Sequence, residues 1–204
     1  MKQLILATQN KNKLKEVKEI LCPLGFEVLS MADVNLADLD VVEDGDTFEA
    51  NALKKAREIH KLTGGAVLAD DSGLMVDALS GAPGVFSARY SGEGATAEKN
   101  NEKLIGELLG LSEDRRGAKF VCVMAFIDDA GCEFVARGEA VGVILESLQG
   151  EGGFGYDPLF FVPGLDKTYA QLSSAEKNSV SHRAKALAGI RAYLEGKEWV
   201  ARNT

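Results

Sequence analysis

Short apolar segments alternate along this chain with segments whose apolar residues recur at helical spacing, and this order most strongly limits its possible folds. Residues 2–7 form an apolar run, and in residues 12–21 the apolar side chains fall on one helical face. The same spacing begins again at Thr47 and stops before Gly64, and a second apolar run follows at residues 66–69. Strands that alternate with helices are typical of α/β proteins, so we predict a mixed sheet with helices on its faces.

The second half of the chain contains the clearest hairpin pattern. Residues 118–128 and 132–143 alternate in polarity and are separated by the turn Asp129-Ala130-Gly131. The segment from Leu79 to Gly94 holds four glycines and one proline, which predicts a long structured loop. Further predicted elements are a strand at residues 27–30, an acidic loop at 33–46, a helix from Thr96 to about Leu109, a strand at 159–162, a capping box at Ser173 and Glu176, and a last helix that Gly196 stops.

Composition excludes several classes of protein. With 204 residues the chain suits one domain with two lobes, and no apolar stretch approaches the length of a membrane span. The apolar start is too short for a secretory signal, so we expect a cytoplasmic protein. Its three cysteines, Cys22, Cys122 and Cys132, are odd in number and lack metal-ligand spacing, which predicts reduced thiols.

The charge balance also limits the possible partners. The chain carries 31 acidic and 23 basic residues, which gives a net charge of -8. This excess disfavours extended binding to nucleic-acid backbones, because that affinity depends on the neutralisation of many phosphates. A small phosphorylated ligand remains compatible, since it needs only a few cations in one place.

Polar residues join the first predicted strand to the first predicted helix. Backbone N–H groups, a hydroxyl, an amide and an ammonium group could converge on an anion there, because the N-terminus of a helix attracts negative charge. Such a polar helix entrance is more often only a helix cap without a ligand. The residues of this connection are Thr8, Gln9, Asn10, Lys11, Asn12 and Lys13.

Two adjacent aspartates follow the apolar run at residues 66–69. Asp70, Asp71 and Ser72 would lie at the carboxyl edge of the sheet, where α/β proteins often display catalytic groups. A carboxylate at this place can hold Mg²⁺ or accept a proton from water, whereas the alternative is a turn that closes the strand. Glu43 supplies a further carboxylate from the acidic loop, although such charge runs are usually solvated.

Two more groups of residues have the chemistry of a ligand site. Between glycines at residues 150–155 and Pro158 stand two aromatic rings and a carboxylate, a pattern that suits a flat molecule such as a nucleobase and equally suits an ordinary turn. The second group lies near the predicted last helix, where cations and an imidazole could bind an anionic or carbonyl-bearing ligand. The residues concerned are Phe154, Gly155, Tyr156 and Asp157, followed by Lys177, His182 and Arg183.

Taken together, these motifs resemble the inosine/xanthosine triphosphate pyrophosphatase family, whose members remove non-canonical purine nucleotides. They occur in the family's order over nearly the whole chain, which makes the set far more specific than any one motif. The motifs are Thr8-x-Asn10-x-x-Lys13, Ala69 to Leu74, Gly81 to Gly84 with Ser87 to Gly92, Gly153 to Pro158, Glu176-Lys177, and Ser181-His182-Arg183.

The resemblance implies an elongated α/β fold, with two lobes around a long mixed sheet, a nucleotide cleft between the lobes, and a homodimer. It also implies Mg²⁺-dependent hydrolysis of ITP, dITP and XTP to the monophosphate and pyrophosphate. By the same resemblance, residues 8–13 bind the triphosphate, Asp71 is the metal-bound general base, and Ser72 contacts the substrate. Residues 154–157 then hold the base, and Lys177, His182 and Arg183 complete the base pocket.

One position departs from the family pattern. Ala50 stands where family members commonly carry a glutamate at the start of the second predicted helix. The neighbouring Glu49 would point about 100° away around the helix and cannot replace it. We therefore expect Glu43 to supply the second metal carboxylate.

Two other functions are compatible with these residues. An enzyme of the same fold could act on another modified nucleotide, since only the base pocket would differ. A nucleotide-binding sensor without turnover is the second alternative, but the retention of Asp71, Lys13 and Lys177 disfavours it because a sensor needs no general base.

Overall fold

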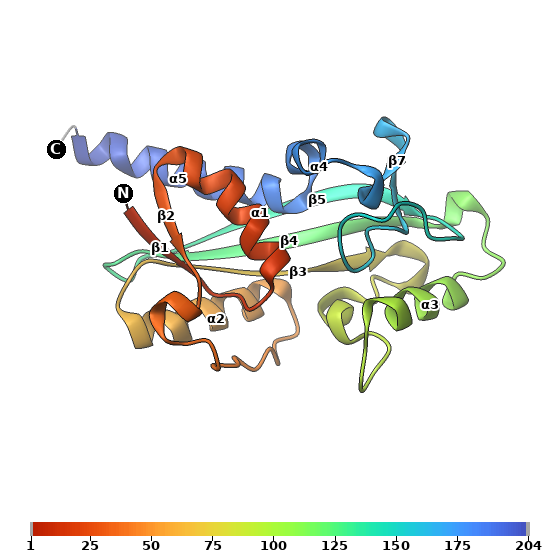
Figure 1. The fold of residues 1–204 in the computed structure, drawn as a ribbon, viewed down its shortest axis with the longest axis horizontal. Helices are drawn as coiled ribbons and strands as arrows, with labels where there is room; N and C mark the ends of the chain where they lie inside the picture. Colours follow the sequence, from red (N-terminus) through yellow and green to blue (C-terminus); the bar gives the residue numbers. More distant parts are fainter. Residues whose placement is uncertain (1, 203–204) are drawn as a thin grey trace. The chain divides into compact units, whose positions relative to one another are not determined.

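The structure is a computed structural model that describes residues 2–202, with side chains up to residue 196. In this part of the chain seven strands form one sheet in the order β2-β1-β3-β4-β5-β6-β7, and five α-helices accompany it (Figure 1). The strands are β1 (Lys2–Leu6), β2 (Phe26–Leu29), β3 (Val67–Val76), β4 (Gly117–Ile127), β5 (Glu133–Ile144), β6 (Phe160–Val162) and β7 (Lys167–Thr168). The helices are α1 (Lys11–Leu21), α2 (Phe48–Thr63), α3 (Ala97–Glu107), α4 (Ser174–Val180) and α5 (His182–Arg202).

The sheet is mixed, as the sequence predicts. Strand β1 pairs in parallel with both β2 and β3. Strand β6 pairs antiparallel with both β5 and β7. Parallel neighbours need crossover connections, which α1 and α2 supply on either side of β2 in the sequence.

The described chain divides into two compact units. The first comprises residues 1–71, 122–138 and 183–204, and the second comprises residues 72–121 and 139–182. Strands β3, β4 and β5 each contribute residues to both units. The chain therefore passes from one unit to the other within these strands, and also between His182 and Arg183.

The core of the first unit is formed by strands β1 to β5 together with α1 and α5. Apolar side chains from these elements pack together, and α1 and α5 cover one face of the strands while α2 lies on the other (Figure 1). Fully buried members of this cluster are Leu6, Val17, Leu21, Leu68, Cys122, Met124, Ala186, Leu187 and Ile190.

The core of the second unit is rich in aromatic rings. Phe120 of β4 contacts Phe160 of β6 at a centroid distance of 4.7 Å and stacks on Tyr169 at 5.6 Å. Leu104 and Leu108 from the region of α3 are buried in the same cluster. Arg116 lies beside this core and is only 3% exposed.

The helix boundaries follow the capping residues that the sequence contains. Thr47 caps α2, which ends at Gly64 in a left-handed conformation. Thr96 caps α3, and Ser173 forms the predicted capping box with Glu176 at the start of α4. None of the described helices is long and apolar enough to cross a membrane.

Three predicted boundaries are wrong. Strand β3 does not end before Asp70 but continues to Val76, so the two aspartates lie within a strand. The last helix does not stop at Gly196 but extends to Arg202, because one glycine in a helix costs only about 1 kcal/mol. Lys177 lies in the separate short helix α4 and not at the start of the last helix.

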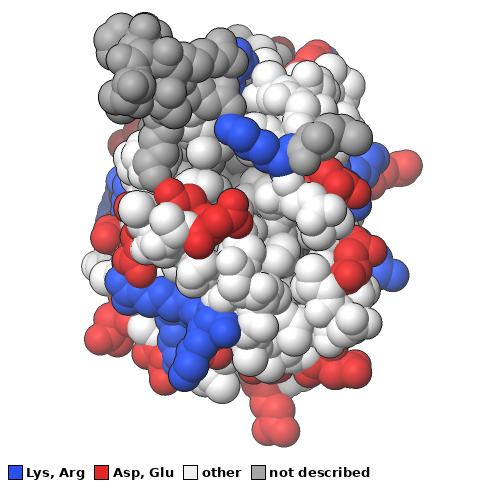
Figure 2. Space-filling model, turned by 90° about the vertical axis from the view of Figure 1, so that its left-hand side faces the viewer, with Lys and Arg blue, Asp and Glu red and all other residues white. Residues whose placement is uncertain are grey.

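The surface charge is mixed on the face that Figure 2 shows. Basic side chains gather at the lower left of this view and occur again near its upper centre, while acidic side chains are scattered between and around them.

We predict that Arg116 stabilises the second unit through buried backbone oxygens. Its guanidinium donates to the carbonyl oxygens of Ile144 at 2.7 Å, Leu108 at 2.9 Å and Leu145 at 2.9 Å. The substitution Arg116→Met should lower the free energy of unfolding by about 3 to 5 kcal/mol, because it leaves these acceptors without a donor. Urea denaturation measures the change, and Arg115→Met at the exposed neighbouring position should have almost no effect.

Candidate active site

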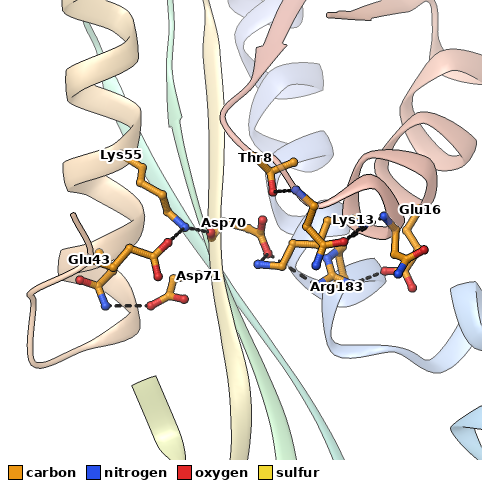
Figure 3. Close-up of polar contacts among 11 residues, drawn as sticks. Thr8, Lys13, Glu16, Glu43, Lys55, Asp70, Asp71 and Arg183 are labelled. Atoms are coloured by element: carbon orange, nitrogen blue, oxygen red, sulfur yellow. Dashed lines mark hydrogen bonds and ion pairs between the residues drawn. The ribbon is translucent and has the colours of Figure 1, made fainter. Parts of the chain in front are cut away.

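The two aspartates of β3 point in opposite directions. Successive side chains of a strand face opposite sides of the sheet, and Figure 3 shows Asp70 directed toward Lys13 and Arg183 while Asp71 lies beside Glu43 and Lys55. Both carboxylates are buried, with exposures of 1% for Asp70 and 5% for Asp71. Each therefore has its own electrostatic environment.

Asp70 is neutralised by two cations. The Lys13 Nζ lies 2.9 Å from its Oδ2, and a guanidinium nitrogen of Arg183 lies 3.6 Å from the same oxygen. Burial alone would raise the pKa of Asp70, but Lys13, Arg183 and Lys55 more than offset it and hold the pKa well below its ordinary value. Asp70 is therefore a permanent anion that fixes the surrounding cations.

Arg183 is only 2% exposed and forms an ion pair with Glu16 of α1 as well as with Asp70. Burial acts to lower the pKa of the guanidinium, but Asp70, Cys122 and Glu16 raise it above its ordinary value. The sequence predicted Arg183 in a base pocket, and the structure places it in the first unit beside the carboxylates of Asp70 and Glu16. The sequence analysis did not predict Glu16 as a partner of Arg183. Glu16 lies one helical turn after Lys13, at a position typical of an ordinary surface residue.

Asp71 has the environment of a general base. Burial raises the pKa of its carboxyl, whereas the ammonium of Lys55 and a hydrogen bond from Asn51 lower it, and the charge of Glu43 raises it again. The Asn51 Nδ2 donates to Asp71 Oδ2 at 3.0 Å. The net result is a raised pKa, which makes this carboxylate a better proton acceptor than an exposed aspartate.

Lys55 binds Glu43 and the backbone of β3 on the side of the sheet where Asp71 lies. Its Nζ lies 2.5 Å from Glu43 Oε1 and 2.5 Å from the backbone oxygen of Asp70 (Figure 3). Burial acts to lower the pKa of Lys55, but Asp70, Glu43 and Asp71 raise it above its ordinary value. Sequence reasoning missed this residue, although its position one turn after Asn51 on the buried face of α2 is a usable signal.

Two side-chain amides anchor the acidic loop at residues 33–46. Gln9 Nε2 donates to the backbone oxygen of Leu39 at 2.9 Å, and Asn51 Oδ1 accepts from the N–H of Gly45 at 2.8 Å. A Cβ atom at Gly45 would lie 2.7 Å from Asn51 Oδ1, so glycine permits this close approach. Gln9, which the sequence placed among the phosphate-binding residues, thus ties the loop that carries Glu43.

The carboxylates of Glu43 and Asp71 are the donors available for a metal ion. The described residues contain no group of three or more histidine, cysteine, aspartate or glutamate side chains that could form a complete metal cage. Mg²⁺ is usually held by one or two carboxylates together with waters and substrate phosphates. The charges of Glu43 and Asp71 both raise the pKa of Lys55, so both carboxylates act on the same cation. Two carboxylates placed in this way fit Mg²⁺.

The connection before α1 is ordered as a helix cap. Asn10 Oδ1 accepts from the N–H groups of Asn12 at 2.9 Å and Lys13 at 3.3 Å, and Thr8 Oγ1 accepts from the N–H of Asn10 at 3.2 Å. Lys11 and Asn12 are exposed in the first turn, which contains no acidic residue. The cap and an anion site are compatible here, because the helix start stays positive and accessible.

The loop at residues 153–157 lies in the second unit and is held from within. Asp157 Oδ2 accepts from the N–H of Phe154 at 2.8 Å and from Lys177 Nζ at 2.7 Å. Gly153 has a φ of +73°, and a Cβ atom there would lie 2.2 Å from Asp157 Oδ2, so this position requires glycine. The loop is thereby built around a buried carboxylate.

The residues predicted to hold the base differ in what they expose. Lys177 Nζ lies 4.7 Å from the ring centroid of Phe154, which is partly exposed. Tyr156 is 5% exposed and its hydroxyl donates to the backbone oxygen of Ser87 at 2.8 Å, so its ring packs in the core and is not placed to stack on a ligand.

His182 is buried, and its ring stacks on that of Phe120 at a centroid distance of 4.8 Å. Gly155 has a backbone φ of +61°. Ser72, which follows Asp71 within β3, is partly exposed.

Comparison with known proteins decides the family. The model of the Ham1 family matches residues 4–193 of this chain. The chain belongs to the Ham1 family. A relative from Clostridium perfringens, named dITP/XTP pyrophosphatase, is 51% identical over 202 residues, which cover 96% of this chain and 98% of the relative. Another of the same name, from Bacillus subtilis, is 46% identical over 195 residues and covers 96% and 98%.

The solved structures agree with this membership. The Ham1 protein of Staphylococcus aureus has a TM-score of 0.86 and 42% sequence identity, and the match covers 96% of this chain and all of that one. The sequence analysis predicted a mixed α/β sheet, and this prediction is confirmed. The roles of its site residues stay predictions.

We predict that Asp70 stabilises the fold in a pH-dependent way. Asp70→Asn should lower the free energy of unfolding at pH 7 by about 3 to 5 kcal/mol, because Lys13 and Arg183 lose their buried counter-ion. The folded pKa of Asp70 lies below the unfolded value near 3.8, so its stabilisation is complete above that value and is lost as the pH falls below it. The difference between the wild type and the variant should therefore shrink on acidification.

Urea denaturation between pH 2 and pH 7 in metal-free buffer measures this difference. Asp44→Asn is a matched control, because Asp44 is exposed and pairs with Lys54. The control should change the stability little at any pH. A constant difference for Asp70→Asn across this range would show that its carboxylate does not carry the stabilisation.

Proposed function

We propose that this protein hydrolyses non-canonical purine nucleoside triphosphates, namely ITP, dITP and XTP, to the nucleoside monophosphate and pyrophosphate. The observation that carries the proposal is the buried Asp71, which has a raised pKa beside Lys55 and Glu43. A general base next to cations suits the attack of water on a phosphoanhydride. The names of the relatives from Clostridium perfringens and Bacillus subtilis support the same reaction.

The triphosphate in this proposal binds at the start of α1. This helix N-terminus offers N–H groups and the positive end of the helix dipole, and Lys11 and Lys13 lie in its first turn. Lys13 pairs with Asp70 in the structure, which holds its ammonium in position before a phosphate arrives. The positioned charge stabilises the negative charge that builds up on the leaving pyrophosphate.

Asp71 in this proposal orients and deprotonates the attacking water. Its hydrogen bond with Asn51 fixes the carboxylate, and burial excludes competing bulk water. The ammonium of Lys55 opposes the effect of burial on the pKa of Asp71. The net pKa is still raised, so this carboxylate is more basic than an exposed aspartate.

We propose Mg²⁺ as the metal, held by Asp71 and Glu43. When bound, it would neutralise phosphate charge and lower the pKa of water. Glu43 is held toward Asp71 by Lys55 and by the loop that Gln9 and Asn51 anchor. In this chain Glu43 therefore supplies the carboxylate that Ala50 does not.

The base in this proposal binds to the second unit. Phe154 offers a partly exposed ring, and Lys177 can donate to the 6-oxo group that hypoxanthine and xanthine share. Adenine carries an amino donor at that position and offers Lys177 no acceptor there, so this hydrogen bond would be lost and adenine disfavoured. His182 is the remaining predicted member of this pocket, whereas Arg183 pairs with Asp70 and Glu16 in the first unit and is not assigned to it.

Because nucleoside triphosphates are kept in the cytoplasm, we place the protein there. We propose a homodimer on the basis of the family resemblance.

Product analysis tests the proposed function. The purified protein is incubated with Mg²⁺ and, separately, ITP, XTP, dITP, ATP and GTP, and chromatography resolves the nucleotides, phosphate and pyrophosphate. We expect monophosphate and pyrophosphate, formed much faster from ITP and XTP than from ATP and GTP. Release of orthophosphate and a diphosphate would overturn the assigned bond, and the absence of turnover would favour a sensor or another modified nucleotide.

We predict that Lys55 is needed for turnover and sets the acidic limb of the pH profile. Lys55→Met should lower kcat by about 10²- to 10³-fold, because Glu43 and Asp71 lose the cation between them. The pKa of Asp71 should rise further in the variant, so the remaining activity should require a higher pH than in the wild type. Initial rates of ITP hydrolysis between pH 5 and pH 9 measure both effects.

Lys54→Met is the matched control for this variant. Lys54 is the preceding residue of α2, but it pairs with the exposed Asp44 of the acidic loop. The control should retain wild-type activity and an unchanged pH profile. Equal losses in both variants would assign the effect to helix α2 in general and contradict the role of Lys55.

A further inference from the structure

Two consecutive asparagines are buried in helix α3. Asn100 and Asn101 are each 5% exposed, although asparagine is a poor residue for a helix interior and a costly one to bury. Each must therefore be compensated by its hydrogen bonds. These bonds go to two different segments of the second unit.

The side chain of Asn100 hydrogen-bonds to the segment before α3 through both its oxygen and its nitrogen. Its Oδ1 accepts from the N–H of Ser91 at 2.8 Å, and its Nδ2 donates to the backbone oxygens of Ser87 at 3.3 Å and Ala88 at 3.2 Å. This residue has an ordinary structural explanation, because it satisfies backbone groups of a loop without regular pairing.

Asn101 makes a different contact, with the loop proposed to hold the base. Its Nδ2 donates to the backbone oxygen of Gly155 at 3.0 Å. Its Oδ1 is buried and accepts no hydrogen bond from the described residues. An unmatched buried acceptor destabilises the folded state, so stability alone does not explain asparagine at this position.

The hydrogen bond from Asn101 reaches the loop at Gly155, where no neighbouring side chain among the described residues packs against the backbone. Gly155 has a φ of +61°, and a Cβ atom there would meet nothing within 4 Å. On one side of Gly155, the N–H of Phe154 is held by Asp157. On the other side, Tyr156 is held by its bond to Ser87. The Gly155 peptide is therefore fixed by Asn101.

We propose that Asn101 is a positioning residue for purine selectivity, which acts by fixing the Gly155 peptide and through it the ring of Phe154. This inference rests on the proposed function, in which Phe154 and Lys177 hold the base. Asn101 itself does not touch the substrate. Its loss lets the ring of Phe154 move relative to Lys177, so it weakens contacts with the base and leaves contacts with the phosphates unchanged.

The test separates base binding from phosphate binding in the variant Asn101→Leu, which keeps the side-chain volume. We expect the affinity for IMP, measured by calorimetry without metal, to fall about tenfold, because one loop hydrogen bond is lost. The KM for ITP should rise by a similar factor with kcat nearly unchanged, and the preference for ITP over ATP should fall. Inhibition by inorganic tripolyphosphate, which has no base, should stay the same.

A destabilised but correctly positioned loop gives a different pattern. Leu104→Ala removes buried side-chain volume one turn along α3, and it should lower the stability while leaving the affinity for IMP unchanged. If Asn101→Leu does not fold, Asn101→Ser gives a smaller disturbance with the same expected direction. Unchanged affinity for IMP in the Asn101 variant, or an equal loss in Leu104→Ala, would overturn the inference.

The two proposals fail in distinguishable ways. A wild-type protein that binds IMP and prefers ITP, together with an Asn101 variant that does the same, would overturn only the role of Asn101. A wild-type protein that neither binds IMP nor prefers ITP would overturn the proposed function and this inference with it. Loss of inhibition by tripolyphosphate in Asn101→Leu would show general damage and contradict selective positioning.

Discussion

The neutralisation of two buried carboxylates on one strand is the constraint on which the rest of the first unit depends. Asp70 and Asp71 stand next to each other in β3, and the alternation of the strand sends one carboxylate to each face of the sheet. Neither could remain charged there without cations. Helices α1 and α5 supply Lys13 and Arg183 on one face, and α2 supplies Lys55 on the other.

The same constraint divides the work between the two aspartates. Asp70 has a lowered pKa and serves as a fixed counter-ion, whereas Asp71 has a raised pKa and lies beside the second carboxylate, Glu43. A structural anion at Asp70 holds the lysine that we assign to the phosphates. A basic carboxylate at Asp71 is suited to act on water. Adjacent residues of one type thus acquire different chemistry from the elements that pack on each face.

Much of this arrangement follows from the sequence, but only where a signal is local. The caps at Thr47, Thr96 and Ser173 lie next to the helices they begin, so they predict helix starts correctly. The continuation of β3 through two aspartates was missed because the cations that permit it come from distant parts of the chain. Lys55 and Glu16 were missed for the same reason, since their partners become neighbours only when the chain folds.

The second unit follows the same principle with amides in place of ions. Asn100 is compensated by the segment before α3 and Asn101 by a loop far away in the sequence. Tyr156 is a core residue whose hydroxyl reaches Ser87. Sequence spacing gives the order of such residues but not the direction of their side chains. The loop at residues 153–157 could be recognised as a motif, whereas the residues that hold it could not.

The role of Asp71 is tested most directly by comparing nucleotide binding and turnover in Asp71→Asn. The substitution keeps the size of the side chain and removes its ability to accept a proton. Our account predicts that kcat for ITP falls by about 10³-fold or more, while the dissociation constant for ITP in metal-free buffer changes less than about threefold. A fully active variant, or one that loses nucleotide binding while it retains turnover, would contradict the assignment of Asp71 as the general base.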